Sequence, residues 1–179
     1  MKKILLLLII PLFSLAHPHV FIDTKLTFAT RHNRIDTLKI TWQFDDMNSQ
    51  IIMMDYDSNR DKKFSKKERQ RFKKTYFDKL SAKNYFTHIK VDGKEMKISN
   101  SINNFSVGYK NHLLIVSYTL DFKKTKQQKS IHIAFWDEVN YNAFLIEEGN
   151  FKFSGKALRT ELDFFESDLF VTDLLKVAL

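Results

Sequence analysis

Apolar and polar residues alternate along two neighbouring stretches in the first quarter of the chain. From Val20 to Phe28 every second residue is apolar or threonine, and the same period of two runs from Leu38 to Phe44. This period is typical of a β-strand with one buried face. His32-Asn33 lies between the two stretches, and asparagine tolerates the left-handed conformation of a tight turn. The pattern predicts a β-hairpin.

The period changes at the Asp45-Asp46 pair. Residues 47–54 form a short predicted helix, with one of these two aspartates as its N-cap. A clearer helix is predicted over Ser65–Leu80, because aromatic and apolar residues recur there at helical spacing between lysines and arginines. Ser65 and Glu68 have the spacing of a capping box, which marks the start of this helix.

The period of two returns after Ser81. Residues 85–98 predict a second hairpin, because Asp92-Gly93 is a favoured two-residue turn. Leu162–Leu179 is amphipathic and predicts a C-terminal helix. Further strands are expected around Asn104–Tyr109, His112–Phe122, Ser130–Trp136 and Asn142–Glu147.

These elements predict a mainly β (α+β) fold. Six to eight antiparallel strands with one helical insertion, at about residues 46–82, favour an antiparallel β-sandwich that ends in a helix. The chain has no repeats and no low-complexity linker, and Pro18 is the only proline after residue 16. We therefore expect residues 17–179 to form a single domain.

The first 16 residues have the three parts of a cleavable signal peptide. Lys2 and Lys3 give a basic start, Ile4–Leu15 is almost entirely apolar, and Ser14-Leu15-Ala16 places small residues where a signal peptidase reads them. The apolar run is too short to cross roughly 30 Å of hydrocarbon as a helix. We expect a periplasmic or secreted protein that begins at His17, with retention as a membrane anchor as the alternative.

Composition narrows the classes of function. Loss of Lys2 and Lys3 with the signal lowers the net charge from +8 to +6, and the remaining lysines occur throughout the chain. We expect solvated basic faces and no nucleic-acid partner. The absence of cysteine excludes disulfides, thiolate metal sites and thiol catalysis. The chain shows no Ser/His/Asp series, no Gly-rich phosphate loop and no pair of acids at catalytic spacing, so we expect no enzyme activity.

The stretch from Asp57 to Glu68 has the spacing of an EF-hand calcium loop. A hard cation needs six to eight oxygen ligands, and such a loop aims alternate residues inward to supply them. Phe64 occupies the apolar eighth position, and helices are predicted on both sides. The candidate Ca²⁺ ligands are the side chains of Asp57, Asn59, Asp61, Ser65 and Glu68 and the backbone carbonyl of Lys63.

One position departs from the calcium pattern. Lys62 stands at loop position 6, where glycine usually makes a sharp turn with positive φ. Arg60 and nearby lysines also oppose a dication. The loop therefore has three interpretations: a weak calcium site, a degenerate loop that keeps the EF-hand shape without the ion, or a chance match with no EF-hand shape.

Signal cleavage would create a second candidate site. It would expose His17-Pro18-His19, which brings an α-amine and two imidazoles together, and imidazole suits Zn²⁺, Ni²⁺ and Cu²⁺. The antiparallel hairpin places the end of its second strand beside the start of its first. Asp45 and Asp46 are thus expected near His17 and His19, where either could complete the site. The alternative for His17 and His19 is that they are an ordinary polar start to a strand. The alternative for Asp45 and Asp46 is that one of them only caps the helix.

Several of these segments resemble one family, catalogued as domain of unknown function 1007. The resemblance runs from Ala16 to about Phe153, and Lys62 replaces the family's usual glycine. The matching segments are His17-Pro18-His19-Val20-Phe21-Ile22-Asp23, Trp42-Gln43-Phe44-Asp45-Asp46-Met47, the loop Asp57–Glu68, Tyr85-Phe86-Thr87 with Val91-Asp92-Gly93-Lys94, and Trp136-Asp137 through Phe144.

The resemblance implies a periplasmic component of an uncharacterised transport system, associated with nickel/cobalt-type permeases. We therefore expect a non-enzymatic metal-binding accessory or adaptor protein that serves a divalent-metal transporter, with an inner-membrane permease and divalent metal ions as partners. One alternative is a calcium-stabilised structural or interaction domain with no transport role. Another is a copper enzyme built on an N-terminal histidine brace.

Overall fold

The computed structural model describes residues 20–99, 101–122, 128–137, 139, 142–167 and 170–179. The predicted signal peptide, His17 and His19 lie outside these residues. The helical elements are α1 (Asp46–Tyr56), α2 (Lys66–Thr75) and the 3₁₀ segments η1 (Phe77–Phe86) and η2 (Glu148–Asn150). The strands are β1 (Val20–Arg31), β2 (Arg34–Phe44), β3 (Thr87–Val91), β4 (Lys94–Glu95), β5 (Ile102–Lys110), β6 (Leu113–Asp121), β7 (Ser130–Phe135), β8 (Asn142–Leu145), β9 (Phe151–Ser154), β10 (Arg159–Glu166) and β11 (Val171–Ala178).

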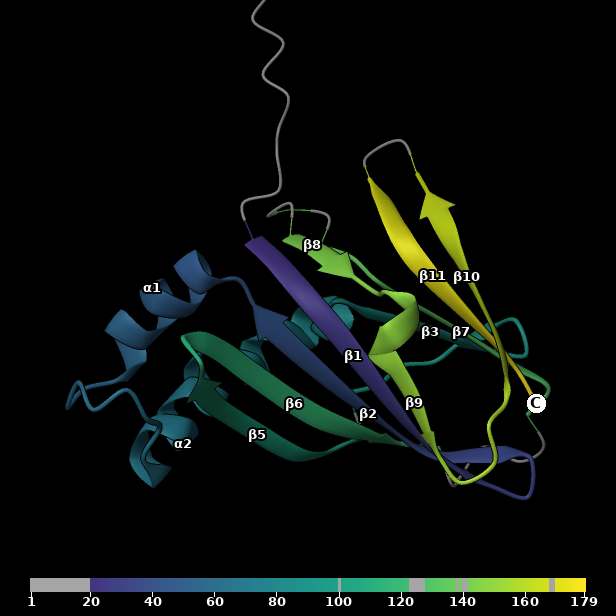
Figure 1. Ribbon diagram of the computed structural model, residues 1–179, viewed down its shortest axis with the longest axis horizontal. Helices are drawn as coiled ribbons and strands as arrows, with labels where there is room; N and C mark the ends of the chain where they lie inside the picture. The colour runs from purple at the N-terminus through teal and green to yellow at the C-terminus, as the bar shows by residue number, and fades with distance from the viewer. Residues whose placement is uncertain (1–19, 100, 123–127, 138, 140–141, 168–169) are drawn as a thin grey trace, which may run out of the picture.

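Within the described residues the strands form two sheets (Figure 1). The first has the order β5-β6-β2-β1-β8, with β9 also paired to β1, and the second has the order β10-β11-β7-β3-β4. The prediction of a mainly β protein is confirmed. The antiparallel pattern is broken along β1, because β8 and β9 both pair with it in parallel.

Both predicted hairpin turns are present. His32 and Asn33 have φ of 49° and 55°, and Asp92 and Gly93 have φ of 50° and 77°. Two consecutive residues in the left-handed region match the right-handed twist of the flanking strands, which is why such turns close hairpins. In the first hairpin Ile22 pairs with Phe44, so β1 begins where β2 ends, as the sequence predicted.

The two sheets share one aromatic core. Phe144 of β8 in the first sheet packs against Phe135 of β7 in the second, with ring centroids 5.9 Å apart. The hydroxyls of Thr87 on β3 and Tyr118 on β6 share a 2.8 Å hydrogen bond across the same core. This hydrogen bond satisfies the hydroxyls of both buried side chains.

The helical insertion starts at the predicted residue, but its second α-helix ends early. Asp45 caps α1, and Ser65 caps α2 with both hydrogen bonds of the capping box. The second helix was predicted to reach Leu80, but α2 ends at Thr75 and a 3₁₀ segment follows. Phe72 and Phe77 are both fully buried, and 3₁₀ geometry after Tyr76 lets the second ring also enter the core. None of the helices among the described residues has the length and apolarity to cross a membrane.

The predicted C-terminal helix is wrong. Residues 159–166 and 171–178 form the antiparallel strands β10 and β11, and β11 also pairs with β7. Leu175 and Val177 point into the core, while Lys176 lies on the other face with Glu161 and Asp163. A short apolar run is compatible with the spacing of a helix or of a strand. Pairing with the edge of β7 stabilises the strand here.

Candidate functional site

The connection between α1 and α2 carries the candidate calcium ligands. The two helices lie together at the end of the molecule beside β5 and β6, and the loop between them projects outward (Figure 1). The side chains at the first and last ligand positions, Asp57 and Glu68, are buried, with 8% and 6% of their surface exposed. Asn59, Asp61, Lys63 and Ser65 are exposed.

The two buried carboxylates accept hydrogen bonds from the loop backbone. Asp57 accepts from the N–H groups of Asp61 and Lys62, at 3.2 and 2.8 Å. Glu68 accepts from those of Ser58 and Ser65, at 2.7 and 2.8 Å. Because Ser58 follows Asp57 directly, the bond to Glu68 closes the loop and brings its first and twelfth positions together.

The exposed acid in the middle of the loop tightens the same turn. Asp61 Oδ1 accepts from the N–H of Lys63 at 2.9 Å, and the N–H of Asp61 donates to Asn59 Oδ1 at 3.3 Å. The side chains at positions 1, 3 and 5 therefore all accept hydrogen bonds from the loop backbone.

The electrostatics favour the ionised form of Glu68. The pKa of Glu68 lies below its usual value, chiefly because the Ser65 backbone N–H and hydroxyl and the Ser58 N–H stabilise the charged form. An ionised, buried carboxylate at the closing position of the loop is what a hard cation requires of that residue.

The backbone keeps the glycine geometry at position 6. Lys62 has φ of 60°, and Arg60 at position 4 has φ of 59°. A non-glycine residue in this region costs about 1–2 kcal/mol. A lysine therefore forms the sharp turn with positive φ that glycine usually forms at this position. This backbone conformation is the strain that the sequence predicted at Lys62.

The donor atoms fit calcium in kind, since all of them are oxygens. Among the residues that the structure describes, however, no three His, Cys, Asp or Glu side chains converge as a metal-binding group. Both oxygens of Glu68 already accept backbone N–H groups, and so do both oxygens of Asp57. The fit to Ca²⁺ thus requires Glu68 to exchange at least one amide for the ion.

The second predicted site is only partly within the described residues. Asp45 accepts from the N–H of Phe21 at 2.9 Å and caps α1 through the N–H of Asn48 at 2.8 Å. Asp46 accepts from Gln50 and is exposed. The acidic pair does lie beside the start of β1. The transition-metal site with His17 and His19 stays a prediction, because both histidines are outside the described part of the chain.

Asp45 is committed to its structural role. Burial raises its pKa, but hydrogen bonds from the backbone N–H groups of Asn48 and Phe21 outweigh burial, so the pKa lies below the usual value. This supports the helix-cap interpretation for Asp45 and leaves Asp46 as the freer candidate ligand.

A stack of rings on the second sheet was not anticipated from the sequence. His88 on β3 lies flat against Trp136, with ring centroids 3.2 Å apart and planes 6° apart, and Phe165 and Phe170 stack on Trp136. Burial lowers the pKa of His88, against the opposing effect of Glu95. The stack borders a hollow of about 280 Å³. Only the pairing of β3 with β7 brings His88 and Trp136 together, so local spacing gave no signal.

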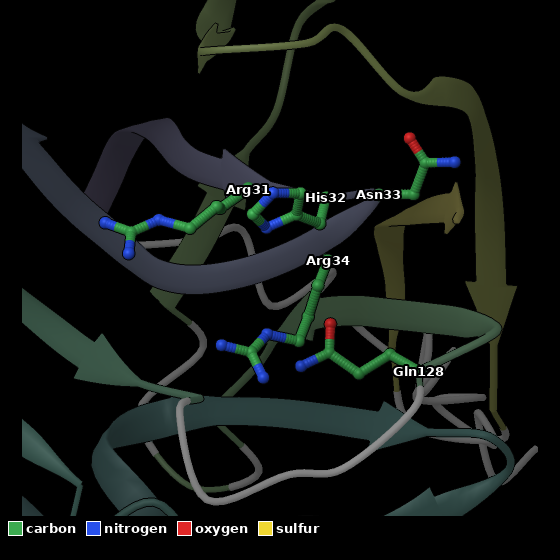
Figure 2. A pocket seen from close by; sticks show the side chains of 5 residues that line it. All are labelled: Arg31, His32, Asn33, Arg34 and Gln128. Atoms are coloured by element: carbon green, nitrogen blue, oxygen red, sulfur yellow. The ribbon is translucent and has the colours of Figure 1, made fainter.

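The turn between β1 and β2 borders another hollow, of about 310 Å³ (Figure 2). Figure 2 shows the Arg31 and Arg34 side chains pointing away from that of Asn33. Both guanidinium groups form ion pairs with Asp36, at 3.3 and 2.6 Å. The Gln128 amide both donates to and accepts from the backbone of Ile35. These bonds give the residues a structural role in holding the turn.

The fold and the loop define a class: a two-sheet β protein with a helix-loop-helix between its second and third strands. The chain belongs to the family described as "Protein of unknown function (DUF1007)", whose sequence profile matches residues 3–163. This confirms the family resemblance seen in the sequence.

Two relatives are themselves uncharacterized. A Haemophilus influenzae protein is 27% identical over 127 residues, which are 71% of this chain and 59% of that protein. A Spirochaeta aurantia protein, an uncharacterized 15.5 kDa protein in the trpE 3′ region, is 40% identical over 47 residues, 26% of this chain and 34% of that protein. The matched region thus spans less than two thirds of either relative.

Proposed function

We propose that this protein is a non-enzymatic accessory domain that binds a divalent cation at the Asp57–Glu68 loop and serves a membrane permease for divalent metals after export. The observation that carries the proposal is the closed loop. The buried carboxylates of Asp57 and Glu68 stand at its first and last positions, and the Ser58 N–H joins the two ends by donating to Glu68. Oxygen donors from Asn59, Asp61, Lys63 and Ser65 lie between them in the sequence.

Calcium is the cation that this donor set favours. All the donors are oxygens, and the loop holds two buried acids and one exposed one, which suits a hard ion. Strain at Lys62 and the surrounding cations weaken the site, so we propose a Kd of roughly 10⁻⁵ to 10⁻³ M on the EF-hand scale. Zn²⁺, Ni²⁺ or Cu²⁺ would bind at the separate N-terminal site, if His17 becomes the first residue.

The experiment is calcium titration by calorimetry and thermal unfolding. Wild-type protein should bind Ca²⁺, and at 100 times Kd its free energy of unfolding should rise by about 2.7 kcal/mol. Glu68→Gln should bind at least tenfold more weakly, because it loses the bidentate ligand. Asp55→Asn is the matched control: it removes one exposed acid two residues before the loop. The absence of heat and of stabilisation at several millimolar calcium would contradict the proposal.

A second function is supported by the packing of the loop. Phe64 inside the loop and Phe72 on α2 are buried against each other, with rings 5.8 Å apart. A cation held by this loop would stabilise the domain even without a role in transport. Metal uptake by cells that lack the protein separates the two functions. The accessory role predicts that these cells take up less nickel, cobalt or zinc, and that the Asp55→Asn variant restores uptake while the Glu68→Gln variant does not. A purely structural role predicts no defect in uptake.

A further inference from the structure

The positive charge of the protein is concentrated in one segment. Residues 57–79 contain ten lysines and arginines but four acids, a net charge of +6. The chain from residue 17 onward also carries +6, so everything outside this segment sums to zero. Lysines and arginines occur throughout the chain, but outside this segment the acids balance them in number.

The segment displays this charge on its surface. All ten cationic residues are exposed, whereas two of the four acids, Asp57 and Glu68, are buried. Helix α1 adds two exposed acids, which leaves +4 over residues 46–79. The cationic residues are Arg60, Lys62, Lys63, Lys66, Lys67, Arg69, Arg71, Lys73, Lys74 and Lys79.

An apolar stripe lies beside these cations. Met47, Ile51 and Met54 follow one another at helical spacing on one face of α1, and their exposed fractions are 62%, 50% and 84%. Exposed large apolar side chains in a row are unusual on a soluble surface and mark a contact surface.

Specific contacts join the stripe to the basic segment. Met54 lines the same hollow as Arg60 and Lys62. The guanidinium of Arg71 on α2 donates to the backbone carbonyl of Asp55 at 2.6 Å and lies over the ring of Tyr56. Through Arg60, Lys62 and Arg71 the stripe therefore adjoins the basic segment of the helix-loop-helix. This surface lies at the end of the molecule that carries α1 and α2 (Figure 1).

We propose that this surface docks on an anionic lipid bilayer. Exposed lysines and arginines are attracted to acidic headgroups, at about 1 kcal/mol for each cation near the surface. Apolar side chains next to them enter the boundary between headgroups and acyl chains. A soluble polyanion would engage the cations but offers no apolar phase for Met47, Ile51 and Met54. The stripe therefore favours a membrane over a nucleic acid as the partner.

The test is flotation of the purified protein with vesicles, in the presence of a calcium chelator. Vesicles of equal parts phosphatidylglycerol and phosphatidylcholine should carry the protein, and pure phosphatidylcholine should not. Binding should fall between about 0.1 and 1 M salt, as the screening length drops from about 10 to 3 Å. The chelator separates this proposal from the previous one, since docking needs no occupied calcium loop.

Matched triple variants test the surface itself. Lys66→Gln with Lys67→Gln and Lys74→Gln should weaken binding about 100-fold, or roughly fivefold per lysine. The control replaces three exposed lysines on or next to β3 and β4, namely Lys90, Lys94 and Lys97, with glutamine and should bind like the wild type.

A second pair of variants tests the apolar stripe. Met47→Gln with Met54→Gln should weaken vesicle binding, while Leu145→Gln with Val171→Gln, two exposed apolar residues on other elements, should not. Equal losses in a test variant and its control would overturn the proposal. So would binding to heparin or single-stranded DNA without binding to acidic vesicles.

Discussion

The backbone N–H of Ser58 donates a 2.7 Å hydrogen bond to Oε1 of Glu68, ten residues further on. The bond places the end of the loop against its beginning. The same carboxylate completes the capping box of α2 through the N–H of Ser65, so the loop and the helix that follows it share one acid. Any ion that enters the loop must compete with these two amides for Glu68.

Lys62→Gly should stabilise the protein and strengthen calcium binding. The lysine has φ of 60°, a conformation that glycine adopts without the steric cost of a side chain. The gain in unfolding free energy should be up to about 1 kcal/mol, because the greater freedom of unfolded glycine offsets part of the relief. Urea unfolding measures it.

Lys63→Gly is the control for this change. The neighbouring lysine is exposed and does not have positive φ, so glycine there should bring no stabilisation. Equal effects of the two substitutions would show that charge removal matters and backbone strain does not.

Asp45→Ala should destabilise the protein by about 1–2 kcal/mol. The substitution removes the cap of α1 and the acceptor for the N–H of Phe21. Asp45→Asn keeps one acceptor oxygen and should cost less. Asp46→Ala removes an exposed acid next to it and should change stability by less than about 0.5 kcal/mol. Chemical unfolding of the three variants checks the order, and equal losses at the two positions would contradict the assignment of the cap.

His88 should make stability depend on pH. Burial against Trp136 lowers its pKa, so the folded state binds the proton less readily than the unfolded chain, whose histidine pKa is about 6.5. Its contribution to stability is fully present above about pH 6.5 and is lost as the pH falls through that value toward the folded pKa.

His88→Phe keeps a ring against Trp136 and removes the proton. The loss of stability between about pH 7.5 and 5.5 should therefore be smaller than in the wild type. Unfolding followed by tryptophan fluorescence at both pH values measures it, and an identical loss in the two proteins would show that His88 does not contribute.

Protein recovered from the periplasm should begin at His17, as its intact mass will show. If it does, an added alanine before His17 removes the chelate of the α-amine with His17 while keeping both imidazoles. Affinity for Zn²⁺, Ni²⁺ or Cu²⁺ should then fall at least tenfold. Unchanged affinity, or no effect of replacing both His17 and His19 with alanine, would contradict the N-terminal site.

Local pattern predicted the elements whose signals are local. The His32-Asn33 and Asp92-Gly93 turns and the Ser65 capping box each lie within a few residues, and the structure has the corresponding turns and cap. The Asp57–Glu68 spacing is also local, and its calcium interpretation stays a prediction. Backbone geometry at Lys62 was also foreseeable, because only a positive φ closes the loop at position 6.

Distant pairing could not be predicted in the same way. Leu174-Leu175 fits a helix or a strand equally well, and only the edge of β7 makes the C-terminal segment a hairpin. The parallel pairing of β8 with β1 and the stack of His88 on Trp136 also depend on strand order, which no short motif encodes.

The most direct test of the calcium loop follows two backbone amides. In ¹H–¹⁵N spectra recorded as Ca²⁺ is added, the Ser58 and Ser65 resonances should shift together and saturate, because Glu68 turns from their N–H groups to the ion. The Lys129 and Ser130 amides, which donate to Asp92 far from the loop, should stay in place. Unmoved Ser58 and Ser65 resonances at several millimolar calcium would contradict the account and leave the loop a closed turn held by Glu68 alone.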